Sequence, residues 1–271
     1  MRVRGFDFDV RDEGDRSGEA VVLLHGFPAY AGSWDRLTPG LIEAGYRVVR
    51  PDQRGYSPGA RPTGRRAYAG GELAADVLAI LDELGLDRVH LVGHDWGGSV
   101  AWRIGATAPD RLRTLTAVST PHPAALVHSF VSSLQGLRSW YMGAAQLPQV
   151  PERLLLASGG APLLRALRRS GLPAATAEDY VARMREPGAL AAALNWYRAI
   201  AYDRDGAGRV TTPTLYVWGT GDSFLGRAAA EDTARFVTGP YTFLPLDGAG
   251  HWIPEVEPER LLQPLLAHLR T

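Results

Sequence analysis

Two residue types are absent from this sequence, cysteine and lysine, and all 29 of its basic residues are arginine. Without thiols, a thiol nucleophile, Cys-ligated zinc and disulfides are excluded, and nothing in the composition indicates an oxidising compartment. Without lysine amines, Schiff-base catalysis and pyridoxal phosphate chemistry are excluded as well. Any chemistry therefore depends on carboxylate, imidazole, hydroxyl or guanidinium groups.

Net charge and long apolar runs are also missing. The 29 acidic residues balance the basic ones, so the formal net charge is zero and no strong attraction to nucleic acid or to an anionic membrane is expected. No stretch approaches the ~20 uncharged apolar residues of a membrane span, and residues 1–10 carry charges without an apolar run of signal-peptide length. We expect a cytoplasmic protein that binds neither nucleic acid nor membrane. Its oligomeric state, monomer or homodimer, stays open.

The sequence does contain an alternation of strand-like and helix-like segments. With 271 residues and 45% hydrophobic content, the chain can bury a large core. Strands are expected at Ala20–Leu24, Arg47–Arg50, Val89–Val92, Leu115–Val118, Thr214–Trp218 and Tyr241–Leu246. Helices are expected at about 33–44, 72–84, 97–108, 227–236 and 258–269. This alternation predicts a mainly parallel α/β sheet with helices on its faces.

The middle of the chain breaks this alternation. Residues 123–202 contain no good strand, and we expect them to form a helical cap inserted into a core made of residues 1–122 and 203–271. Apolar residues recur in this segment at helical spacing and are expected to form the inward faces of cap helices: Phe130, Leu134, Leu137 and Tyr141, then Leu190, Leu194 and Tyr197.

The strongest motif is Gly-His-Asp-Trp-Gly-Gly at residues 93–98, which follows an expected strand and opens an expected helix. Small residues on both sides suit the tight, strained turn of a nucleophile elbow, which exposes its central side chain at the carboxyl edge of the sheet. Here that side chain is Asp95, a carboxylate that can attack saturated carbon without first losing a proton at pH 7. The competing interpretation is that Asp95 only caps the following helix.

A second motif, His25-Gly26-Phe27-Pro28, directly follows the first apolar strand. On this type of fold such a loop lies against the elbow, so the backbone N–H groups of Phe27 and Trp96 could point at one oxygen. Two such donors form an oxyanion hole that stabilises a tetrahedral intermediate. For the His25 side chain we favour a structural hydrogen bond that holds the loop in place.

A third motif places a histidine after the last strand, in Gly248-Ala249-Gly250-His251-Trp252. His251 can reach the elbow from this edge and act as general base for a water molecule. It needs an acid to orient it, and the candidate is Asp222, because no carboxylate follows the strand that ends at Val118. The order nucleophile, acid, histidine is the order typical of the α/β-hydrolase arrangement. Asp222 could instead be only a turn residue beside Gly221.

These motifs resemble the epoxide hydrolase branch of the α/β-hydrolase superfamily over nearly the whole chain. The resemblance implies a mainly parallel, eight-stranded sheet with helices on both faces, a helical cap, and no metal or organic cofactor. It also implies two cap tyrosines that donate to the epoxide oxygen. The candidates are Tyr141, in Ser-Trp-Tyr-Met, and Tyr197, in Asn-Trp-Tyr-Arg. A phenol is neutral at pH 7 and can donate a proton, although both could be ordinary core tyrosines.

The expected activity is conversion of a small hydrophobic epoxide and water to a diol through an ester on Asp95, with Phe27, Trp96, Trp140 and Trp196 contacting the substrate. A haloalkane dehalogenase with the same nucleophile is the nearest alternative, since a cap tryptophan at position 140 or 196 could bind halide. A ligand-binding protein that keeps the pocket without catalysis is the other. The natural substrate is not predicted.

Overall fold

A seven-stranded sheet forms the centre of the computed structural model, which describes residues 1–203 and 208–271. The strand order is β3-β5-β4-β6-β7-β8-β9, and only β3 is antiparallel to its neighbour. The mainly parallel α/β class is thus confirmed, and β3 is a strand that the sequence patterns did not predict. The strands are β3 Val10–Glu13, β4 Ala20–Leu24, β5 Arg47–Pro51, β6 Val89–His94, β7 Leu112–Val118, β8 Thr214–Gly219 and β9 Tyr241–Leu246.

The expected count of eight strands is wrong for the part of the chain that the structure describes. Strands β1 (Arg2–Val3) and β2 (Phe6–Asp7) pair only with each other and do not join the central sheet. The two residues between them, Arg4 and Gly5, have φ angles of 49° and 82°. This left-handed turn folds the chain back after two residues, so neither strand is long enough to extend the sheet.

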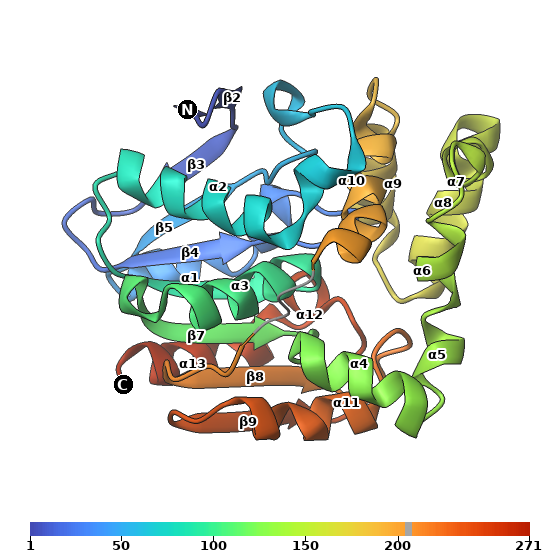
Figure 1. Ribbon diagram of the computed structural model, residues 1–271. Coiled ribbons are helices and arrows are strands. Elements are labelled where there is room, and N and C mark those ends of the chain that lie inside the picture. Colours follow the sequence, from blue (N-terminus) through green and yellow to red (C-terminus); the bar gives the residue numbers. More distant parts are fainter. Residues whose placement is uncertain (204–207) are drawn as a thin grey trace.

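Helices cover both faces of the sheet (Figure 1). The two faces follow from the alternation of side chains along β4: Val22 and Leu24 pack in one cluster with α2 and α3, whereas Val21 and Leu23 pack in another with α1 and α13. These core helices are α1 Thr38–Glu43, α2 Gly70–Glu83, α3 Trp96–Thr107, α11 Arg227–Asp232, α12 Ile253–Val256 and α13 Pro258–Leu269. Short 3₁₀ turns lie at 31–34, 58–60, 65–68, 109–111, 200–202 and 233–236.

The described residues between β7 and β8 form helices joined by turns and contain no strand, and Figure 1 shows α4 to α8 following one side of the molecule. Its helices are α4 Pro123–Ser132, α5 Gln135–Arg138, α6 Trp140–Ala144, α7 Val150–Leu155, α8 Ala157–Arg169, α9 Ala174–Met184 and α10 Ala189–Ala199. The domain boundaries at 122/123 and 202/203 stay a prediction, and residues 204–207 of the expected core lie outside the described residues.

The expected inward faces of the cap differ from the structure in one half. Leu190, Leu194 and Tyr197 on α10 are buried as predicted. In contrast, Leu134 and Leu137 are exposed, and Gln135 between them is buried. The prediction was wrong here because the chain does not continue as one helix: it becomes extended at Ser133, so the helical spacing no longer assigns one face. No helix in the described residues is long and apolar enough to cross a membrane.

Candidate active site

Asp95 lies in a strained turn between β6 and α3. Its φ of 50° and ψ of −120° are unusual for a residue with a side chain. Glycine is required two residues later, because a Cβ on Gly97 would approach the carbonyl oxygen of Leu24 to 2.2 Å. The side chain of Asp95 makes no capping hydrogen bond to α3. The interpretation of Asp95 as a helix cap is therefore wrong, and its carboxylate is free to point elsewhere.

The Asp95 carboxylate is held between the His25–Pro28 loop and His251. The Phe27 amide donates to Asp95 Oδ1 at 2.8 Å, and Oδ2 lies 3.6 Å from His251 Nε2. A Cβ on Gly26 would collide with the carboxylate, so only glycine lets the loop approach this closely. Burial alone would raise the pKa of Asp95, but hydrogen bonding and attraction from His251 outweigh burial and lower it. Asp95 is therefore ionised at neutral pH.

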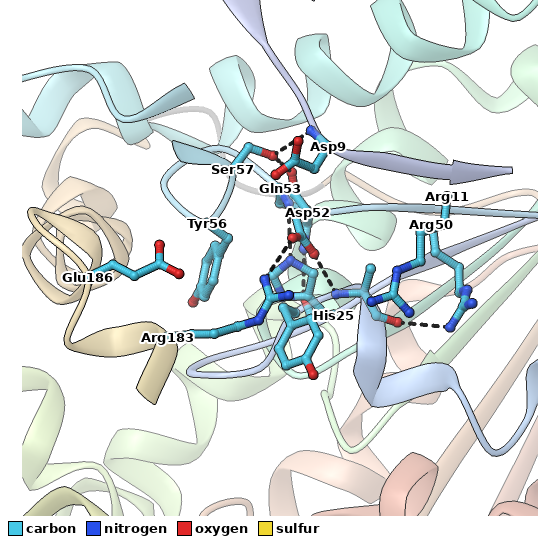
Figure 2. Close-up of polar contacts among 12 residues, drawn as sticks. Asp9, Arg11, His25, Arg50, Asp52, Gln53, Tyr56, Ser57, Arg183 and Glu186 are labelled. Atoms are coloured by element: carbon cyan, nitrogen blue, oxygen red, sulfur yellow. Dashed lines mark hydrogen bonds and ion pairs between the residues drawn. The ribbon is translucent and has the colours of Figure 1, made fainter. Parts of the chain in front are cut away.

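The loop that supplies the Phe27 amide is held by its histidine (Figure 2). His25 Nε2 accepts from the backbone N–H of Gln53 at 3.1 Å, and His25 Nδ1 donates to the Gly26 carbonyl at 3.0 Å. Burial lowers the pKa of His25, so the ring is neutral, as this pairing requires. The structural role expected for His25 agrees with these bonds. For the Trp96 amide, no hydrogen bond to Asp95 exists among the described residues, so its role as second donor stays a prediction.

His251 is oriented by Asp222, which follows β8. His251 Nδ1 lies 2.8 Å from Asp222 Oδ2, and the other oxygen of this carboxylate accepts from the amides of Phe224 and Leu225. Asp222 is therefore more than a turn residue. Burial would lower the pKa of His251, but the Asp222 and Asp95 carboxylates outweigh burial and raise it to about 10. The resting site thus contains an imidazolium between two carboxylates.

This ion pair predicts a pH-dependent stability. Because the pKa of His251 rises from an ordinary 6.5 to about 10 on folding, the stabilisation is fully present below about pH 6.5 and is lost as pH rises through 10. The free-energy difference of unfolding between wild type and His251→Gln should accordingly shrink over this range in urea titrations. Asp222→Asn, which removes the partner carboxylate, should lose most of the same dependence. A difference that is constant with pH would contradict the raised pKa.

Several residues for which the sequence predicted no role at the site hold the loops of His251 and Asp222 in place. The Ser119 hydroxyl donates to the His251 carbonyl at 2.8 Å, and His94 Nε2 donates to the same oxygen at 2.9 Å. From the cap, Arg138 donates to the Asp222 carbonyl, and Gln135 bridges the Phe224 carbonyl and the Gly226 amide. Ser119 could have been found, since it directly follows β7 at the same sheet edge. No sequence pattern predicts the contacts that Arg138 and Gln135 make from the cap.

The two expected tyrosines come from different cap helices and lie together above Asp95. Tyr141 is on α6 and Tyr197 is on α10, and their ring centroids are 6.0 Å apart. Tyr197 also packs edge-on against Trp96 and Phe27. Burial and then the nearby Asp95 charge raise the pKa of both phenols well above 10. Both hydroxyls therefore carry their protons across the physiological range.

Two cavities meet at this point, with volumes of about 350 and 440 Å³. Asp95, Tyr141 and Tyr197 line both of them. The first is also lined by Phe27, His251 and apolar cap residues, and the second by Trp96 and the start of α4. A ligand that spans the junction would therefore place its centre between the Asp95 carboxylate and the two phenols.

The two other tryptophans expected at the substrate lie apart. Trp140 lines the first cavity and is 71% exposed, so it stands at the cavity mouth. Trp196 is fully buried and lines neither cavity; its Nε1 donates to the Arg54 carbonyl at 2.9 Å. Direct substrate contact by Trp196 is therefore wrong for this structure. It packs against Trp96 instead and supports the site from behind.

Comparisons with known proteins agree with the fold described above. The family model described as the α/β hydrolase fold matches residues 19–258. The AB hydrolase superfamily protein YfhM of Bacillus subtilis is 36% identical over 100% of this chain and 96% of its own length. Epoxide hydrolase A of Mycobacterium tuberculosis is 32% identical over 98% of this chain and 94% of its own length.

A solved structure gives the same result at the level of the fold. Epoxide Hydrolase A from Mycobacterium thermoresistibile has a TM-score of 0.87 and 28% identity to this protein, covering 100% of this chain and 97% of that one. This chain therefore belongs to the α/β-hydrolase superfamily, within its epoxide hydrolase branch.

Proposed function

We propose that this protein hydrolyses epoxides to vicinal diols through a covalent ester on Asp95. The observation that carries the proposal is that Asp95, Tyr141 and Tyr197 line the junction of the two cavities. An alkoxide is a poor leaving group unless a proton donor meets it, and two protonated phenols opposite a carboxylate supply both requirements. Relatives named epoxide hydrolases, at about a third identity over nearly the full chain, support the same activity.

In the first step the phenols donate to the epoxide oxygen, and Asp95 Oδ2 attacks one ring carbon from the opposite side. The carbon–oxygen bond breaks, and the ring oxygen takes a proton from one tyrosine. Ester formation removes the Asp95 charge that helps to raise the pKa of His251, so that pKa falls. The imidazolium can then return a proton to the tyrosinate, which leaves His251 neutral and able to act as a base.

In the second step neutral His251 removes a proton from water, and the hydroxide attacks the ester carbonyl. The Phe27 amide, 2.8 Å from Oδ1 in the resting site, donates to the oxyanion, with the Trp96 amide as the second donor. The intermediate releases the diol, whose alkoxide takes the proton of the new carboxylic acid. Asp95 is again a carboxylate and His251 an imidazolium, so the proton count closes.

The nearest alternative is haloalkane dehalogenation. That reaction uses the same nucleophile but needs N–H donors for the halide. Trp196 Nε1 is already bound to the Arg54 carbonyl, and Trp140 is at the exposed mouth, so neither is suited to this task. A panel of terminal and internal epoxides beside bromoalkanes of equal size tests the choice. We expect diols and no bromide. Bromide release without diol would contradict the proposal, and tight binding without any turnover would favour a non-catalytic protein.

His251→Gln should separate the two steps. Asp95 can still attack, but the ester loses its general base, so its hydrolysis should slow by on the order of 10³-fold. Intact-protein mass spectrometry after mixing with substrate should then show one added substrate mass on most of the protein. Asp222→Asn should accumulate the same adduct to a smaller extent, because His251 stays present but is poorly oriented. Absence of any adduct in both variants would contradict an ester intermediate.

A further inference from the structure

The cap exposes a concentration of large hydrophobic side chains. Of the thirteen such side chains that are exposed in the described chain, nine lie between residues 127 and 154. They belong to α4 to α7 and the turns between them, which follow one side of the molecule (Figure 1). We call this set the cap face: Val127, Phe130, Val131, Leu134, Leu137, Trp140, Leu147, Val150 and Leu154.

The pattern of burial along the cap face is the reverse of an ordinary surface helix. Val131, Leu134 and Leu137 are 87%, 73% and 72% exposed, while the polar Ser129 and Gln135 are buried. Ser129 and Gln135 make their hydrogen bonds within the protein, whereas the exposed leucines leave apolar area in water that burial would remove. Large exposed apolar patches mark interaction surfaces in soluble proteins. The cap face is therefore built to be covered.

The charges of the cap indicate what covers it. Helices α4 to α8, residues 123–169, contain five arginines and one acidic residue, Glu152, in a chain whose formal net charge is zero. That single carboxylate is already paired with the buried Arg198 at 2.7 Å. Two of these arginines, Arg138 and Arg153, lie within the cap-face segment, and the other three are exposed on α8, which packs against α7. The apolar cap face is therefore flanked by positive charge on its α8 side, without a free carboxylate between residues 123 and 169.

The cap face is also continuous with the two cavities. Trp140, Leu147 and Leu154 line the first cavity while being exposed at the surface. Val127 and Phe130 do the same for the second. A protein seated on the cap face would cover both openings, whereas a lipid surface would leave apolar molecules a path into them.

We propose that the cap face docks on an anionic lipid surface. An apolar face with arginines within its segment and on the adjacent α8 has both attractions that stable interfacial binding needs, namely apolar burial and charge. A second copy fits less well, because a two-fold interface brings the same patch against itself and would give its arginines no acidic partner. The zero net charge of the whole chain predicted no membrane partner, but the local excess of arginine in α4 to α8 favours an anionic membrane. Docking would let apolar epoxides pass from the lipid into the cavities, and only this part of the proposal rests on the proposed function.

The test is co-sedimentation of the full-length protein with vesicles of phosphatidylcholine, with and without phosphatidylglycerol. Wild type should bind the anionic vesicles at least tenfold more tightly than the neutral ones, and added salt should weaken the binding. The variant Val131→Ser/Leu134→Ser/Leu137→Ser should bind the anionic vesicles at least tenfold more weakly. None of these three residues lines a cavity, so its turnover of dissolved substrate should be unchanged.

Val256→Ser is the control, since Val256 is an exposed hydrophobic residue on α12 away from the cap face; its vesicle binding should equal wild type. Equal binding by the triple variant and wild type, or binding by neither, would overturn the proposal. So would a wild-type dimer, seen by analytical ultracentrifugation, that the triple variant loses, because the cap face would then be a protein interface. Vesicle binding is measured without substrate, so its failure is distinguishable from a failure of the proposed activity.

Discussion

Replacing Asp95 by Asn should lower epoxide turnover by on the order of 10⁴-fold or more, because the side chain that forms the ester is no longer a nucleophile. The amide has nearly the same shape, and its oxygen can still accept from the Phe27 amide. The loss should therefore fall on the chemical step, with substrate binding retained. Pre-steady-state measurement of diol formation, together with a binding titration, distinguishes the two.

The Asp95→Asn variant can regain its carboxylate, whereas Asp95→Ala cannot. Slow deamidation of the introduced amide would restore the carboxylate, so activity that grows with storage of the Asp95→Asn variant is itself a sign that the carboxylate is required. Asp95→Ala cannot regain a carboxylate and should stay inactive. Turnover near the wild-type rate in freshly prepared Asp95→Ala would show that this carboxylate does not perform the reaction.

Replacing both Tyr141 and Tyr197 by Phe should slow ester formation by on the order of 10³- to 10⁴-fold, as expected for the loss of general acid catalysis at a poor leaving group. Each single variant should retain part of the rate, since one phenol still meets the ring oxygen. The rings and their packing against Trp96 and Phe27 stay in place. The rate of adduct formation in a His251→Gln background isolates this step from ester hydrolysis.

Tyr216→Phe is the matched control for the tyrosine pair. Tyr216 is fully buried in the core, its hydroxyl has no hydrogen-bond partner in the described chain, and it lines neither cavity. Removing its hydroxyl should leave adduct formation unchanged. Full epoxide turnover by the double variant would exclude the tyrosines as proton donors.

The sequence predicted the parts of this protein whose signals are local. The strand before Asp95, the glycines at 93 and 97 and the helix after them identify the elbow. A Cβ on Gly93 would collide with the backbone at the start of α3, and one on Gly97 would collide with the backbone at the end of β4. His251 and Asp222 could be found because each follows a parallel strand, and the carboxyl ends of these strands meet at one edge of the sheet.

What the sequence did not predict depends either on local backbone turns or on contacts between distant segments. Helical spacing does not show that Leu134 and Leu137 are exposed, since the chain leaves the helix at Ser133 and turns. The bond from Trp196 to Arg54 joins residues 142 positions apart, and nothing near either residue signals it. The separate β1–β2 hairpin likewise follows from the left-handed turn at Arg4 and Gly5.

The central claim is that Asp95 forms a covalent ester, and a single turnover in ¹⁸O-labelled water tests it most directly. Enzyme in excess over a styrene-oxide-type substrate is allowed to react once, and the diol is examined by mass spectrometry. If the ester forms, water attacks the Asp95 carbonyl carbon, so the first diol carries unlabelled oxygen from the carboxylate and the label stays in the protein. Labelled diol from the first turnover, with none in Asp95, would show direct attack by water and contradict the account.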